Sequence, residues 1–264
     1  MLTSCPSEAV ALKALNTLRA IDMSPSSKER PDECFTNQSF MVNNLKTSIQ
    51  LFKEVTQAAL TLVKTVTPEA LPFDIIALIL IYETSVSKKK VLEATLHSHV
   101  KDNYYKTGLL KEFYSKYKQV AKNFQTTALH LAIGLLKADS PAHIEFGIEW
   151  LRNMFVVQSD TTYKQREIME KLLNLMGNKD KTVKNALEVL CRMANDEKER
   201  EYLQHHACFL RCFLEKIDNL NFDEVSMLYH LLHGLCAHSE YISNYLDNEL
   251  AIIMQKQLCS SKVL

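Results

Sequence analysis

Residues that force a sharp change of chain direction are scarce in this sequence. Its 264 residues include only five glycines and six prolines. Folds built from many short strands need frequent turns, in which glycine and proline predominate. The scarcity of both residues therefore favours long helices, and we expect an all-α fold.

Long apolar runs and ordered cysteine patterns are also missing. The longest apolar run, Ile75–Ile81, is far shorter than the roughly 20 residues that cross a membrane. The N-terminus lacks the basic-then-apolar pattern of a secretory signal. Seven cysteines, an odd number without regular spacing, fit a reducing compartment better than a disulfide framework. We expect neither a membrane protein nor a secreted one.

We find no motif for catalysis. The five glycines are isolated, which excludes phosphate-cradling loops and glycine-flanked nucleophiles. Paired acids such as Glu167 and Glu170 fall on predicted amphipathic helices, where solvation explains them. We therefore expect no enzymatic activity, no catalytic residue and no cofactor.

Two groups of histidine and cysteine residues have a spacing that could suit a metal ion. They are His205, His206, Cys208 and Cys212, and then His230, His233, Cys236 and His238. No paired Cys-x-x-Cys motif is present, and apolar residues surround both groups. We interpret them as core-packing residues and surface histidines, and we expect no metal site.

Helical periodicity divides the chain into three parts. Residues 1–23 contain a terminal helix of a preceding helical unit, and residues 24–37 form a polar linker with two prolines. Over residues 38–264 helices begin about every 20 residues, or about 40 per antiparallel pair, which is typical of HEAT and armadillo arrays. We therefore expect a helical-repeat α-solenoid of antiparallel helix pairs in this third part.

Some helix ends can be placed from their capping residues. A periodic apolar pattern runs from Phe40 to Val66, and Thr67 with Pro68 should begin the next helix. Asn221 is followed three residues later by Glu224, a variant of the capping box, so another helix should begin there.

Net charge is absent as well, since thirty-one Lys and Arg balance thirty-one Asp and Glu. Contact with an anionic partner must then come from a local patch. One segment qualifies, because nine lysines and three acids lie between positions 88 and 122. The candidate DNA contacts within it are Lys88, Lys89, Lys90, Lys111, Lys118 and Lys122.

The last three of these lysines fall on one face of a predicted helix. The opposite face is apolar and comprises Leu109, Phe113, Tyr117, Val120 and Phe124. A lysine face of this kind can meet the phosphates of a nucleic acid or an acidic partner. It can equally be the solvated exterior of an ordinary helix, so both interpretations stay open.

Three segments of the sequence carry a resemblance to a known family. They are DIIALILIYETSVSKKKVLEATLHSHVKDN at 74–103, FLEKIDNLNFDEVSMLYHLLHGLCAHS at 213–239 and DNELAIIMQKQLCSS at 247–261. The chain resembles the Fanconi anaemia group D2 family over residues 43–261, in collinear order. In the third segment the family's Lys-Gln-Leu-Ser-Ser ending is matched by Lys256, Gln257, Leu258, Ser260 and Ser261. The resemblance implies an internal part of a much larger helical-repeat protein.

The resemblance further implies a nuclear, non-enzymatic scaffold of DNA interstrand crosslink repair. Its implied partners are the Fanconi anaemia group I paralogue as a heterodimer, double-stranded DNA held in a clamp, and ubiquitin with its ligase machinery. In the family the ubiquitin acceptor lies beyond the Lys-Gln-Leu segment, in a Tyr-Lys-Leu-Ile-Gly context. Lys262 lies in Ser-Lys-Val-Leu, which does not match, so we expect no acceptor within this chain.

Two other function classes stay open on the sequence alone. A generic armadillo or HEAT adaptor would bind peptides along a ladder of aromatic or asparagine residues, and we see no such ladder in the sequence. The third class is an enzyme, or the helical subunit of one.

Overall fold

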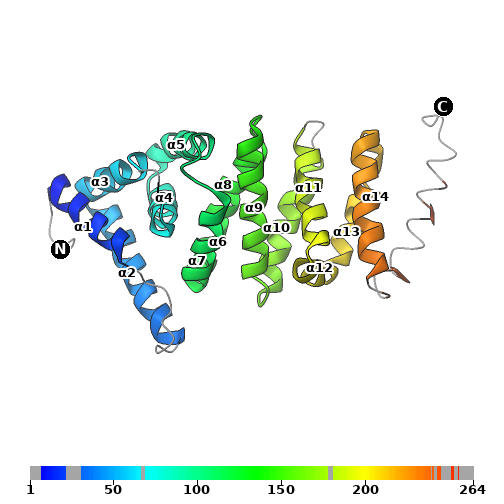
Figure 1. Cartoon of the computed structure of the whole chain (residues 1–264), viewed down its shortest axis with the longest axis horizontal. Coiled ribbons are helices and arrows are strands. Elements are labelled where there is room, and N and C mark those ends of the chain that lie inside the picture. The colour runs from blue at the N-terminus through cyan, green and yellow to red at the C-terminus, as the bar shows by residue number, and fades with distance from the viewer. Residues whose placement is uncertain are drawn as a thin grey trace. The chain divides into compact units, whose positions relative to one another are not determined.

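The computed structural model describes residues 7–21, 31–66, 69–177 and 181–238, together with 240, 243–244, 251–252 and 255. Within these residues the chain forms fourteen α-helices and two short 3-10 helices and no strand (Figure 1). The expected all-α class is confirmed. None of the helices in the described ranges is long and apolar enough to span a membrane.

The chain divides into two compact units, residues 1–157 and 158–264. The first contains α1 (Glu8–Ala20), α2 (Pro31–Leu51), α3 (Lys53–Lys64), α4 (Pro72–Thr84), η1 (Val86–Lys88), α5 (Lys89–Lys101), α6 (Thr107–Lys116), α7 (Lys118–Asn123), α8 (Gln125–Leu136) and α9 (Pro141–Val157). The second contains α10 (Thr162–Leu175), α11 (Thr182–Asn195), α12 (Glu197–Gln204), α13 (Ala207–Leu214), η2 (Ile217–Asn219) and α14 (Phe222–Ala237). The segment expected over 38–264 therefore comprises parts of two units.

Helix α4 is the core of the first unit. Its sequence, PFDIIALILIYET, is apolar on every side instead of along one stripe, which is typical of a fully buried helix. All residues from Pro72 to Tyr82 are buried. Helices α1, α2, α3, α5, α6 and α8 pack around it. The apolar run that is too short to cross a membrane thus forms the centre of a globular unit.

A partly buried ion pair fixes α1 to the beginning of α4. The Asp74 carboxylate accepts hydrogen bonds from Arg19 Nε at 2.6 Å and from Arg19 Nη2 at 2.9 Å. The same carboxylate accepts from the Leu71 backbone N–H at 2.7 Å and so caps α4. Thr67 and Pro68, the predicted start of this helix, lie outside the described residues. Residues 69–71 are not helical, and α4 begins at Pro72.

Helix α2 differs from expectation at both of its ends. It begins at Pro31, so residues 31–37 are helical where a linker was expected, and residues 22–30 lie outside the described ranges. This first part is helical because it packs: Cys34 and Gln38 are buried, and Gln38 Nε2 donates to the Lys116 carbonyl at 2.8 Å. The periodic run from Phe40 to Val66 is also not one helix, since Phe52 has extended backbone angles between α2 and α3.

The second unit is built from amphipathic helices. Helix α11 buries one face, which includes Val183, Leu187 and Leu190, and it packs against α10, α12 and α14. The predicted capping box of α14 is confirmed: Glu224 N–H donates to Asn221 Oδ1 at 3.0 Å, and Asn221 N–H donates to Glu224 Oε2 at 2.9 Å. Local patterning of this kind is sufficient to place most helices of this unit.

Candidate nucleic-acid interface

The basic segment is not the single helix that the sequence predicts. Helix α6 ends at Lys116 and α7 begins at Lys118, because Tyr117 between them is buried and its backbone leaves the helical range. The predicted apolar face is nonetheless buried at Leu109, Phe113, Tyr117, Val120 and Phe124. The prediction that three lysines share one helix face is wrong. Lys111 lies on α6, whereas Lys118 and Lys122 lie on α7, which is a separate helix.

The run of three lysines lies at the C-terminal end of α4. Lys88 ends η1, and Lys89 and Lys90 begin α5. The Lys89 Nζ is 4.9 Å from the centroid of the Tyr82 ring, a cation–π distance that ties the run to the end of α4. Lys90 is exposed, and the other two lysines are half-buried.

The junction between α6 and α7 lies at the other end of α4. A small cavity of about 150 Å³ is lined by Pro72 and Phe73 from the first turn of α4 and by Lys116 and Tyr117 from the junction. Because a helix of this length extends about 20 Å, Lys118 and the three-lysine run stand at opposite ends of α4.

Lys46 on α2 contacts one residue near the three-lysine run and one residue near Lys122. Its Nζ lies 3.1 Å from Glu83 Oε2, next to Tyr82 in the sequence, and 6.0 Å from the centroid of the Phe124 ring, two residues after Lys122. Sequence reasoning missed Lys46 because it lies in a different helix, and only the packing of α2 on α4 and α7 brings it here. We define the basic strip as Lys46, Lys88, Lys89, Lys90, Lys118 and Lys122. Lys111 is exposed on α6 and is not part of it.

Two carboxylates beside the strip, those of Glu83 and Glu93, are held by neighbouring side chains. Glu83 pairs with Lys46, and Glu93 accepts a hydrogen bond from the Tyr82 hydroxyl at 2.6 Å. Burial and this hydrogen bond raise the pKa of Tyr82, so the phenol stays protonated and donates. The six lysines of the strip outnumber Glu83 and Glu93, the two carboxylates described beside it, which suits phosphate contacts that do not depend on base sequence.

The histidine and cysteine groups divide into buried and exposed members. His206 is buried, with its Nε2 3.2 Å from Gln165 Oε1, and burial lowers its pKa, helped by the neighbouring His205. The exposed members are His205, His230, His233 and His238, and the half-buried ones are Cys212 and Cys236. The Cys208 side chain lies outside the described ones. Across the described part of the chain, no three His, Cys, Asp or Glu side chains gather as a metal-ligand set.

The predicted family segment near the C-terminus cannot be placed. Residues 256–264, which hold the Lys-Gln-Leu segment and Lys262, lie outside the residues that the structure describes. The expectation that the chain contains no ubiquitin acceptor therefore stays a prediction.

Comparison with known proteins identifies the family. A sequence profile described as "Fanconi anaemia protein FancD2 nuclease" matches residues 9–264. The Fanconi anemia group D2 protein of Gallus gallus is 22% identical over 266 residues, which cover 98% of this chain. The homologs of Mus musculus and Rattus norvegicus are each 22% identical over 261 residues, or 97% of this chain. The chain spans 18% of the length of each of these relatives. Because the profile covers nearly the whole sequence, the chain belongs to the FancD2 family.

Proposed function

We propose that this chain is part of a non-enzymatic nuclear scaffold of DNA interstrand crosslink repair, and that it binds duplex DNA through the basic strip. The observation that carries the proposal is the family match over residues 9–264. The strip supports the DNA part of it, because lysines from α2, η1, α5 and α7 are placed around one buried helix. Cations held on packed helices can meet a phosphate backbone with little further ordering.

The remaining parts of the proposal concern the whole protein. The relatives are much longer than this chain, which spans 18% of the length of each. We infer a heterodimer with the Fanconi anaemia group I paralogue, closure around DNA as a clamp, and regulation by monoubiquitination. We also infer that the helices continue as a solenoid of antiparallel pairs. Close packing of α8 on α9, and of α11 on α14, supports that architecture.

The family description contains the word nuclease, whereas we propose binding without cleavage for this part of the protein. The support is the state of the carboxylates in the strip: Glu83 is held by Lys46 and Glu93 by Tyr82. The test is incubation of labelled duplex and branched DNA with the chain and Mg²⁺ or Mn²⁺. Cleavage that is lost in Glu83→Gln or Glu93→Gln would overturn this part of the proposal.

DNA binding is tested by removing three lysines of the strip at once. Lys90, Lys118 and Lys122 are replaced by Gln, which removes charge without adding repulsion. If each contacts a phosphate, the slope of log affinity against log salt should fall by about 0.9 per lysine, or about 3 in total. Fluorescence anisotropy with a labelled duplex at four salt concentrations measures the slope.

The matched control removes three exposed lysines of the second unit, Lys171, Lys184 and Lys198. Both triple variants change the net charge equally, so a difference between their slopes reports position. A third variant, Lys111→Gln, tests whether the lysine outside the strip contributes, and we expect it to behave like wild type. Equal slopes in both triple variants would show that the strip is only a solvated surface and would contradict DNA binding through it.

A further inference from the structure

An exposed histidine lies beside the basic strip. The His130 side chain on α8 is 67% exposed, and its Nε2 lies 4.0 Å from Glu93 Oε1 on α5. The same carboxylate oxygen accepts the 2.6 Å hydrogen bond from the Tyr82 hydroxyl, so α4 helps to fix its position. The centroids of the His130 and Tyr82 rings are 5.9 Å apart. Side chains of three helices, α4, α5 and α8, therefore meet at this point.

Tyr82 also connects this histidine to the lysines of the strip. Lys89 Nζ lies 4.9 Å from the centroid of the Tyr82 ring, so Lys89 and His130 both contact one aromatic ring. Helix α8 follows α7, which carries Lys118 and Lys122. His130 is therefore placed next to the strip by packing, although it is distant from the three-lysine run in the sequence.

Glu93 is the charged neighbour of His130 within the described residues. Helix α8 packs on α4 and α9. Besides Tyr82, the titratable or charged side chains of these two helices are Asp74, Glu83, His143, Glu145, Glu149 and Arg152. Three of these carboxylates pair with residues other than His130, namely Asp74 with Arg19, Glu83 with Lys46 and Glu149 with Arg152. A charge on His130 is therefore felt first by Glu93.

His97 is a second histidine near Glu93, and its surroundings differ. It lies one turn after Glu93 on α5 and is half-buried. Burial and the ring of His143, whose centroid is 4.5 Å away, lower the pKa of His97, although Glu93 opposes this. A positive charge on His130, by contrast, is open to solvent and faces a carboxylate. Of the two histidines, His130 is thus the one on which a charge is both hydrated and paired.

We propose that His130 is a proton-dependent DNA contact of the basic strip, and that duplex binding takes up one proton from solvent onto its ring. This inference rests on the proposed function, because the strip must bind DNA for the proton to have an effect. Histidine side chains change their charge between about pH 5 and 8. A phosphate beside the ring favours the charged form, and by linkage the charged form favours the phosphate. The lysines of the strip are then joined by one further cation at low pH.

The test measures duplex affinity by fluorescence anisotropy at several salt concentrations, at pH about 8.0 and about 5.5, which lie on either side of the ordinary pKa of histidine. For the wild-type chain, the slope of log affinity against log salt should be steeper at the lower pH by about 0.9, the value of one further phosphate contact. His130→Asn should have the same slope at both pH values. His130→Lys carries its charge throughout and should have the steeper slope at both. Circular dichroism establishes that each protein keeps its helix content at both pH values.

Two matched variants separate His130 from the other histidines. His97→Asn alters the second histidine beside Glu93, and His233→Asn removes an exposed histidine on α14 of the second unit. Both should keep the wild-type increase in slope at low pH. Two results would overturn this inference: a wild-type slope that does not change with pH, or an increase that His130→Asn retains.

DNA binding by the strip is decided separately, at pH about 8.0, by the triple replacement of Lys90, Lys118 and Lys122 with Gln. If that variant loses slope while His130→Asn leaves the pH dependence intact, the strip binds DNA without a proton at His130. If the triple variant loses no slope relative to its control in the second unit, both proposals fail.

Discussion

The two units of this chain hold their helices together by different means. In the first unit, buried polar groups connect helices that are distant in the sequence. Arg19 of α1 pairs with Asp74 of α4, and Trp150 Nε1 of α9 donates to the Tyr114 hydroxyl of α6 at 3.1 Å. Each connection fixes the position of one helix against another. Breaking one leaves a buried polar atom without its partner, which costs more than the intact bond contributes.

In the second unit, the described ion pairs lie within single helices. Arg192 pairs with Glu188 at 2.8 Å on α11, and Arg166 pairs with Glu170 at 3.3 Å on α10. Such partly exposed pairs contribute about 0.3–0.5 kcal/mol each. The helices are joined mainly by apolar faces. The polar contacts between them include His206 with Gln165, Cys191 Sγ with the Met227 carbonyl at 3.6 Å, and Gln204 Nε2 with the His238 carbonyl at 3.5 Å. The comparison indicates that single polar substitutions should damage the first unit far more than the second.

The largest expected effect is that of Asp74→Ala. This change leaves Arg19 without its buried partner and removes the cap on the Leu71 N–H, so the first unit should lose about 3 kcal/mol of unfolding free energy. The single tryptophan, Trp150, is buried in the first unit and reports its unfolding by fluorescence in urea.

The matched change in the second unit is Glu188→Ala, which breaks an ion pair of similar length within one helix. It should lower stability by less than about 0.5 kcal/mol, because both side chains are partly solvated. Hydrogen exchange of the α10–α14 amides, followed by mass spectrometry, measures that unit separately. If the two substitutions cost the same, the contrast between the units would be wrong.

A smaller effect is expected from acidification. Burial and the neighbouring His143, whose ring centroid is 4.5 Å away, lower the pKa of His97 in the first unit, although Glu93 opposes this. Burial also lowers the pKa of His206 in the second. A histidine with a lowered pKa in the folded state binds protons more readily when unfolded. The free energy of unfolding should therefore fall as the pH drops below about 6.5, the usual pKa of histidine. The loss should be complete once the pH is below the lowered pKa values of the folded state.

Substitution separates the two contributions to this pH dependence. His97→Asn should flatten the pH dependence of the first unit alone, and His206→Asn that of the second alone. Hydrogen exchange at pH values between 7.5 and 5.5, corrected for the intrinsic exchange rate, resolves the units. A variant that flattens neither unit would show that its histidine does not take up a proton on unfolding in this range.

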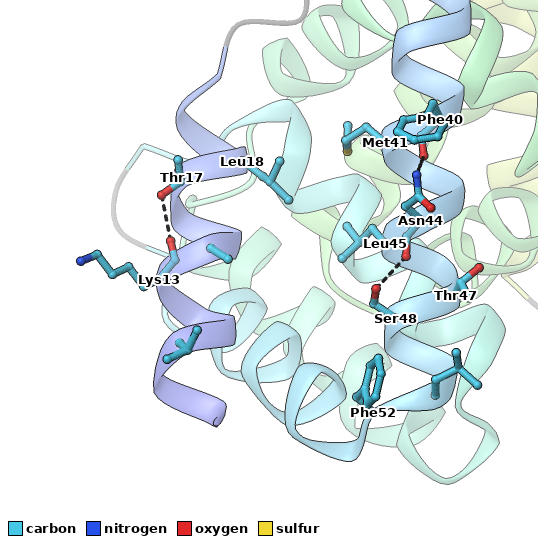
Figure 2. A pocket seen from close by; sticks show the side chains of 13 residues that line it. Lys13, Thr17, Leu18, Phe40, Met41, Asn44, Leu45, Thr47, Ser48 and Phe52 are labelled. Carbon is cyan, nitrogen blue, oxygen red and sulfur yellow. Dashed lines mark hydrogen bonds between the residues drawn. The ribbon is translucent and has the colours of Figure 1, made fainter. Parts of the chain in front are cut away.

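Local patterns in the sequence predicted the helices and one apolar face but not the contacts between helices. The capping box of Asn221 and Glu224 and the burial of Phe113 follow from residues a few positions apart. The basic strip depends on Lys46, which reaches the other lysines only through the packing of α2. The periodic apolar pattern begins at Phe40, and periodicity cannot reveal that this side chain is left exposed between α1 and α2 (Figure 2). Tertiary packing decides both features.

Glycine-to-alanine changes within helices should also have modest effects on stability, and here the direction of the change is informative. At Gly147 of α9, an added Cβ would lie 3.1 Å from the Ala132 carbonyl oxygen and 3.2 Å from Leu135 Cβ on α8. At Gly134 of α8 and Gly234 of α14, nothing lies within 4 Å of that position. Gly147 is therefore a position at which an added methyl group would crowd the neighbouring helix, and α8 or α9 would have to shift by a few tenths of an ångström.

Alanine has a helix propensity about 1 kcal/mol better than glycine, so Gly134→Ala and Gly234→Ala should each raise stability by about 0.5–1 kcal/mol. At Gly147 the same gain is opposed by overpacking against backbone, which costs about 1–3 kcal/mol, so Gly147→Ala should be destabilising by about 1 kcal/mol. Urea unfolding followed by Trp150 fluorescence measures the two changes in the first unit, and hydrogen exchange measures Gly234→Ala. If Gly147→Ala stabilises as Gly134→Ala does, then α9 moves away from α8 at little cost, and the first unit is less tightly constrained than its buried polar contacts imply.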